Sequence, residues 1–115
     1  MNVLELEDAA ADAAGLLRSL ASEKRLRILC LLSDGERSVG EICAALEVSQ
    51  ANASQQLAIL RRAGLVRGRR DGQTVRYSLA SEQGRRVLET LCRVYARRPS
   101  AGSSRARRSP TPRGY

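Results

Sequence analysis

Apolar residues recur with helical spacing over five stretches of the 115-residue chain. Three of the stretches follow a serine that can cap a helix, at Ser22, Ser38 and Ser49. Ser38 is followed three residues later by Glu41, the spacing of a capping box. The pattern predicts helices over the ranges 8–20, 23–32, 39–46, 50–63 and 82–98.

The third and fourth predicted helices are joined only by "EVS", the spacing of a helix-turn-helix. The segments "LVRGRR" and "TVRYSL" then alternate as strands around Asp71-Gly72, a strong hairpin signal. We therefore expect an α+β, mainly helical domain over residues 1–98. Residues 99–115 are rich in Ser, Pro, Gly and Arg without periodicity, which predicts a disordered basic tail.

Charge is distributed unevenly along the chain, whose net charge is +8. Residues 1–20 carry −3, whereas residues 61–76 carry +5 and residues 97–115 carry +6. Such clusters of cations indicate a polyanionic partner. Aromatic residues make up only 3% of the chain, so the core must be built from smaller aliphatic side chains, and a second subunit would help to complete it.

The longest uninterrupted apolar run, Ile28–Leu32, is far too short to span a bilayer, and the N-terminus is acidic where a secretory signal would be basic. We expect a cytoplasmic protein with no membrane partner. Its three cysteines would then normally stay reduced. The chain has no histidine, no paired carboxylates in an apolar stretch and no Gly-rich phosphate loop, so we expect neither an enzyme nor a cofactor.

The fourth predicted helix has two different faces. At 100° per residue, Ala53, Leu57 and Leu60 fall on one side. The opposite side is formed by Ala51, Gln55, Ala58 and Arg62, with Gln50 at the tip and Ser54 on the flank. Ile59 fits neither face.

An uncharged face of small and amide side chains can enter a DNA groove closely, and Gln can pair with adenine in a bidentate manner. The arginines that follow would hold the phosphate backbone. A polar helix face by itself would equally fit a merely solvated surface. The capped helix before it and the Arg-rich hairpin after it favour DNA binding.

The stretch "SVGEICAALEVSQANASQQLAILRRAGLVRGRRDGQTVRYSL" resembles the winged helix-turn-helix of the ArsR/SmtB family of bacterial repressors. The resemblance implies a homodimer that pairs through its first and last helices, binds a double-stranded DNA operator and leaves it when an inducer arrives. By this resemblance the base-reading positions are Gln50, Ala51, Ser54 and Gln55, and the wing is Arg67 to Arg76. With the helix cap and the arginines at the end of the helix, the expected DNA-binding residues are Ser49, Gln50, Ala51, Ser54, Gln55, Arg61, Arg62, Arg67, Arg69, Arg70, Gln73 and Arg76.

Metal sensing is one signal that the family uses. The metalloid sensors carry an "ELCVCDL" box with two cysteines, whereas this chain has "EICAAL", in which Cys43 is retained and Ala45 replaces the second thiol. A closed zinc site needs three or four Cys, His or carboxylate ligands. We therefore expect no metal site and favour a packing role for Cys43, with a metal-responsive repressor kept as an alternative.

Thiol sensing is the other signal, used by a subgroup typified by HlyU, BigR and SqrR. "RILCLL" resembles its second-helix segment, with Cys30 as the thiol. The partner position falls on Ala96, and Cys92 lies one turn earlier, a displacement of about 6 Å. A bridge between Cys30 and Cys92 would then need helix sliding or a different arrangement. The alternatives are cysteines that only pack, and a non-inducible protein-interaction or nucleoid-type module.

Overall fold

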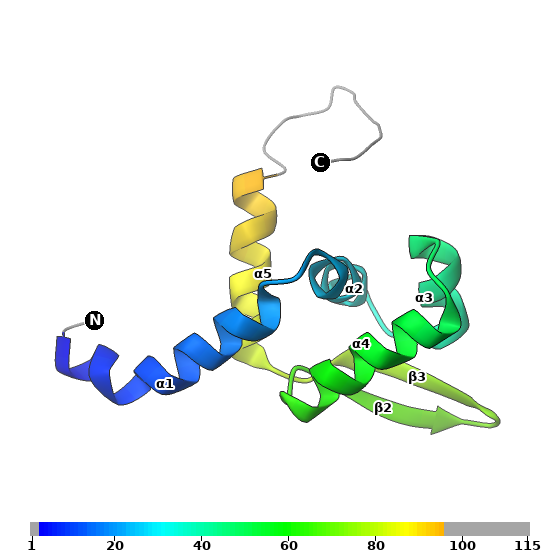
Figure 1. The fold of residues 1–115 in the computed structure, drawn as a ribbon, viewed down its shortest axis with the longest axis horizontal. Helices are drawn as coiled ribbons and strands as arrows, with labels where there is room; N and C mark the ends of the chain where they lie inside the picture. The colour runs from blue at the N-terminus through cyan, green and yellow to red at the C-terminus, as the bar shows by residue number, and fades with distance from the viewer. Residues whose placement is uncertain (1–2, 96–115) are drawn as a thin grey trace.

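The computed structural model describes residues 3–95 and contains five helices and three strands (Figure 1). In chain order these are α1 (Val3–Leu20), α2 (Glu23–Ser33), β1 (Arg37–Ser38), α3 (Val39–Leu46), α4 (Gln50–Arg62), β2 (Val66–Asp71), β3 (Thr74–Leu79) and α5 (Glu82–Tyr95). The expected five helices and hairpin are therefore confirmed. The expected tail lies outside the described residues.

Each expected serine cap is present, and this explains where the helices start. The hydroxyls of Ser22 and Ser49 accept hydrogen bonds from backbone N–H groups three residues later, at 3.3 and 3.0 Å. Ser38 and Glu41 form the complete capping box, each side chain accepting from the other's backbone N–H. Helix α3 ends at Glu47 in the left-handed conformation, with φ of 58°, which turns the chain sharply toward α4.

The sheet is antiparallel, with the strand order β1-β3-β2. Its hairpin closes with Asp71 opposite Thr74, and Gly72 adopts a φ of 67°, which glycine tolerates without strain. The sequence pattern missed β1. Two residues are too few to show alternation, and their partners on β3, Tyr77 and Arg76, lie about 40 residues away in the chain.

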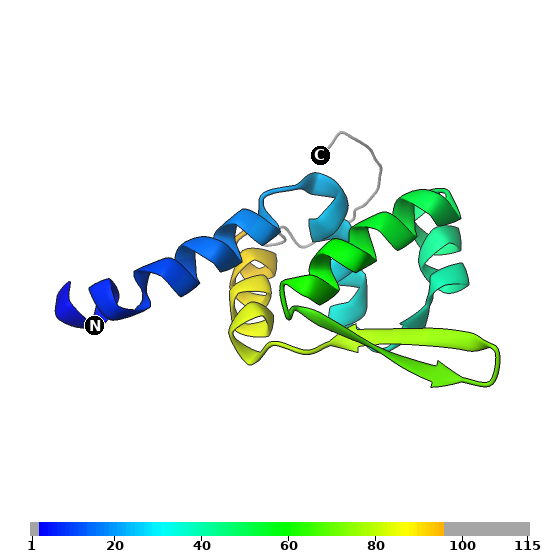
Figure 2. The ribbon, with the colours of Figure 1, turned by 60° about the horizontal axis from the view of Figure 1, so that its bottom comes forward.

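The core lies where α2 packs against α3, α4, α5 and β3. Its largest fully buried side chains come from several elements and are all aliphatic: Leu29, Leu32, Ile42, Leu57, Leu60 and Leu88. Helix α1 extends away from this core, toward the side opposite the hairpin tip (Figures 1 and 2). Leu17 on α1 and Tyr95 at the end of α5 are 59% and 79% exposed in one chain. Within residues 3–95, no helix is both long enough and apolar enough to cross a membrane.

Candidate nucleic-acid interface

Helix α4 presents the two faces that its sequence predicts. Ala53, Leu57 and Leu60 are at most 1% exposed and pack into the core. The exposed residues on the other side are Gln50, Ala51, Ser54, Gln55, Arg61 and Arg62, and Ala58 is half-buried. The Ser49 hydroxyl caps the helix by accepting from the Asn52 N–H. The outward face of the N-terminal half of α4 is therefore polar and uncharged.

Hydrogen bonds at the C-terminal end and on the inner side of α4 hold this helix in place. The Leu65 N–H donates to the Leu60 carbonyl at 3.0 Å, and Gly64 adopts a φ of 78°, so the chain leaves the helix directly into β2. On the inner side, Arg25 of α2 donates to Gln56 Oε1 at 3.4 Å and to the Ser19 carbonyl at 2.7 Å. Arg25 thus links the end of α1 to the helix that carries the uncharged face.

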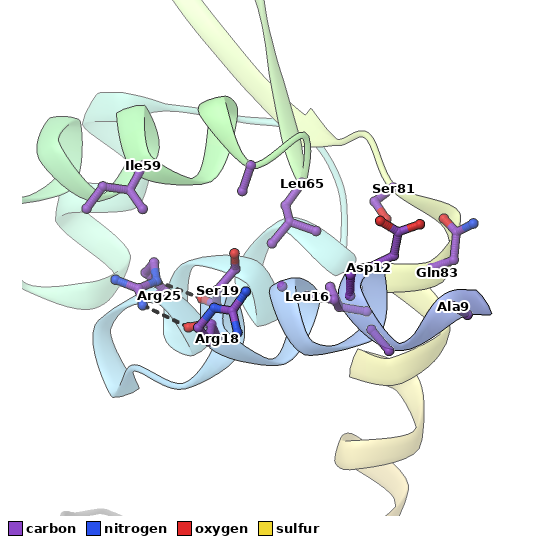
Figure 3. Close-up of a pocket in the computed structure, with 14 residues that line it drawn as sticks. Ala9, Asp12, Leu16, Arg18, Ser19, Arg25, Ile59, Leu65, Ser81 and Gln83 are labelled. Atoms are coloured by element: carbon purple, nitrogen blue, oxygen red, sulfur yellow. Dashed lines mark hydrogen bonds between the residues drawn. The ribbon is translucent and has the colours of Figure 1, made fainter. Parts of the chain in front are cut away.

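Ile59 belongs to neither face because it borders a hollow between α1 and α4. This hollow has a volume of about 880 Å³, and Leu16, Ile59 and Leu65 contribute apolar side chains to it (Figure 3). Asp12 from α1 and Gln83 from α5 lie at its other end (Figure 3). The sequence alone could not place Ile59, since the position of α1 is set by tertiary packing.

The hairpin carries its arginines on both faces. Cross-strand partners share a face of a sheet, and Arg69 is paired with Arg76 while Arg70 is paired with Val75. Arg67, two residues from Arg69, lies on the Arg69 face.

Arg70 lies on the other face of the hairpin, together with the buried Val66 and Leu79. Gln73 is exposed at the turn. The expected wing residues therefore do not form one continuous surface.

Two of the expected phosphate-binding arginines are already paired with carboxylates. Arg69 and Arg76 both donate to Glu36, and Arg76 also donates to Glu41 at 3.2 Å. The bond from Arg69 holds the pKa of the Glu36 carboxyl below its usual value. The pKa of Glu41 is lowered mainly because its carboxylate accepts from the Ser38 backbone N–H. Sequence reasoning missed both ion-pair partners, because nothing in the local pattern connects positions 33 to 40 residues apart.

The four remaining arginines of the expected site are exposed and form no ion pair with the side chains that the structure describes. These residues are Arg61, Arg62, Arg67 and Arg70. Arg61 and Arg62 lie in the last turn of α4, and Arg67 and Arg70 lie on β2. Along the chain, arginines that lack an ion-pair partner among the described side chains thus come directly after the uncharged face of α4.

The three cysteines are all free thiols, but two of them are neighbours. The pKa of Cys30 is raised to about 11, mainly by burial and further by the nearby Cys92 thiol, through charge repulsion and a side-chain hydrogen bond. The one-turn displacement of Cys92 therefore does not separate it from Cys30. Cys43 packs against the core cluster. Among the described residues, no group of three or more His, Cys, Asp or Glu could hold a metal ion.

Comparison with known proteins gives one consistent result. The family model described as "Bacterial regulatory protein, arsR family" matches residues 22–67. The chain is 50% identical to the transcriptional activator HlyU of Vibrio cholerae, over 83% of this chain and 88% of the relative. It is 41% identical to the biofilm growth-associated repressor of Agrobacterium fabrum, over 78% of this chain and 77% of the relative.

Solved structures agree with this result. Reduced HlyU from Vibrio cholerae superposes with a TM-score of 0.76 at 48% identity, covering 81% of this chain and 98% of that one. A homodimeric winged helix-turn-helix DNA-binding domain from Mycobacterium bovis superposes with a TM-score of 0.69 at 35% identity, covering 79% of this chain and 85% of that one. The expected fold class is thus confirmed.

Proposed function

We propose a specific mode of DNA binding and control, from the premise that this chain belongs to the arsR family of bacterial regulatory proteins and is a DNA-binding transcriptional regulator, not an enzyme. It is a cytoplasmic, dimeric repressor that reads an operator with α4 and releases it when its thiols are oxidised or persulfidated. The observation that carries the DNA-binding mode is the uncharged outward face of α4 next to four unpaired arginines.

Base reading is assigned to the exposed polar face of α4. Gln55 lies at its centre, and the neighbouring Ala51 and Ser54 are small enough to let the helix approach base edges in the major groove. No carboxylate lies on α4 to repel phosphates. Arg61, Arg62 and Arg67 would contact phosphates, which supplies affinity and fixes the register without reading sequence.

Dimerisation is assigned to the ends of α1 and α5. Leu17, Val94 and Tyr95 are large apolar side chains that stay more than half exposed in one chain. The Mycobacterium bovis relative is homodimeric. A two-fold dimer would place two α4 helices about 34 Å apart, one turn of DNA, and would therefore bind a palindromic site.

Control is assigned to the pair of thiols. Cys92 is exposed, so its thiolate would react first, attacking the terminal sulfur of a polysulfide or an oxygen of a peroxide and displacing the shortened polysulfide or hydroxide. The half-buried Cys30 would then lose its proton and attack the modified sulfur, closing a disulfide and expelling hydrosulfide or water. The two thiols supply the two electrons that reduce the oxidant. Since α2 packs against both α4 and α5, movement of either thiol-bearing helix can reach the DNA-reading helix.

Selection of duplexes from a random pool by the reduced protein tests the proposal. We expect a palindromic sequence to be enriched, and to be bound more tightly than random duplex of equal length by fluorescence anisotropy. Polysulfide treatment should then weaken binding to the enriched duplex. Equal binding to the two duplexes would instead support a sequence-indifferent DNA-packaging protein.

A further inference from the structure

The carboxylate of Glu36 lies between two arginines of the hairpin. Its Oε1 accepts from Arg69 Nη2 at 2.7 Å and from Arg76 Nε at 3.3 Å, and its Oε2 accepts from Arg69 Nε at 3.2 Å. Arg69 therefore holds the carboxylate with two parallel bonds, an arrangement that fixes the plane of the guanidinium as well as its distance. Glu36 itself belongs to the short connection between α2 and β1.

The Glu36 carboxylate reduces a charge repulsion between two strands of the sheet. Arg69 and Arg76 are directly opposite each other on β2 and β3, and like charges in that relation destabilise strand pairing. Glu36 places one negative charge between them. Arg76 donates its other bond to Glu41, whose carboxylate also completes the cap of α3. The network thus ties the hairpin to the first helix of the helix-turn-helix.

The exposure of the groups indicates that orientation, more than stability, is what these pairs supply. The side chains of Arg69 and Glu36 are 57% and 32% exposed. Ion pairs exposed to this degree contribute little to stability, because solvent screens them. A guanidinium has five N–H donors, and Arg69 uses two of them on Glu36, which leaves three free to contact a phosphate. Arg76 also uses two donors, one on each of two carboxylates, but at 26% exposed its side chain is less accessible to a phosphate than that of Arg69.

We propose that Glu36 is a positioning residue for DNA binding. It holds Arg69 in one orientation on the hairpin face that lies away from the core, and it withholds Arg76 from phosphates. This inference rests on the proposed role of the hairpin as a DNA-contacting wing. Without the Glu36 carboxylate, Arg69 would swing freely and Arg76 would keep only its bond to Glu41, so both could bind phosphates of any sequence more readily. Because phosphate contacts carry no sequence information, binding to random DNA would strengthen and the preference for the specific duplex would fall.

Three variants test whether the negative charge must lie at the position of the Glu36 carboxylate or only has to be present somewhere in the protein. Glu36→Gln removes the carboxylate. Glu36→Asp keeps the charge but shortens the side chain by one methylene, so it reaches the two arginines less well. Glu89→Gln is the matched control, because Glu89 is exposed on α5 and forms no ion pair within residues 3–95. Each is titrated by anisotropy, from 50 to 200 mM salt, against the duplex enriched by the wild-type protein and against random duplex.

For Glu36→Gln we expect the slope of log affinity against log salt on random duplex to steepen by about 0.9 for each arginine freed. One such contact changes the affinity for random duplex about threefold over this salt range. The preference for the enriched duplex should fall, because the gain on random duplex carries no sequence information. Glu36→Asp should lie between the wild type and Glu36→Gln, and Glu89→Gln should match the wild type. Thermal unfolding of each variant is recorded alongside, and Glu36→Asp carries the comparison if Glu36→Gln does not fold.

A slope and preference for Glu36→Gln equal to those of Glu89→Gln would overturn the inference, since Glu36 would then act only through net charge. So would a loss of affinity for both duplexes by the same factor. If the wild type itself shows no preference, the proposed function fails instead, and the slopes on random duplex still decide the role of Glu36.

Discussion

Replacing Gln55 with alanine removes the amide that α4 presents at the centre of its exposed polar face. The Gln55 side chain makes no hydrogen bond within residues 3–95 that the change would break, and alanine favours a helix at least as well as glutamine. The folded state should therefore be unaffected. Losing a bidentate base contact costs about 1–3 kcal/mol, which is about a 5- to 150-fold loss of affinity for the enriched duplex and little loss on random duplex.

The adjacent Gln56 is a matched control for this experiment. It is half-buried on the inner side of α4 and accepts a hydrogen bond from Arg25, so it cannot face the groove at the same time. Gln56→Ala should change the preference for the enriched duplex much less than Gln55→Ala does. Competition anisotropy with both duplexes measures the two variants side by side. Equal losses on both DNAs for Gln55→Ala, or a loss of preference as large for Gln56→Ala, would refute the assignment of the base-reading face.

Three other outcomes are expected. Leu60→Ala truncates a fully buried side chain on the inner face of α4 and leaves a cavity in the core. It should lower the free energy of unfolding, measured in urea, by about 2–5 kcal/mol. The ion pairs that lower the pKa of Glu36 stabilise the fold at any pH above the ordinary glutamate pKa of 4.5. This stabilisation is lost as the pH falls through the lower pKa that Glu36 has in the folded state. Glu36→Gln should therefore make the melting temperature depend less on pH in the acid range. Polysulfide should produce a Cys30–Cys92 linkage that mass spectrometry detects, and should weaken operator binding by the wild type. A Cys30→Ser, Cys92→Ser double variant should keep its operator affinity after the same treatment. Equal losses of affinity in the two proteins would place the switch elsewhere.

The sequence alone determined the helices, their caps and the hairpin. Each of these depends on residues within a few positions of one another: the Ser38 capping box closes across three residues, and the hairpin closes across Gly72 and Gln73. The two faces of α4 followed from the same local geometry, because a helix repeats every 3.6 residues wherever it lies. The candidates for base reading therefore follow from the spacing of residues along this one helix.

The tertiary structure decided which distant residues meet. It paired β1 with β3, brought Glu36 against Arg69 and Arg76, and placed the Cys92 thiol beside Cys30 although the chain position suggested a displacement of one turn. It also explained Ile59, which borders the hollow beside α1. Such contacts depend on the angles and distances at which helices and strands pack in the core, and a local pattern of apolar and polar residues does not specify those quantities.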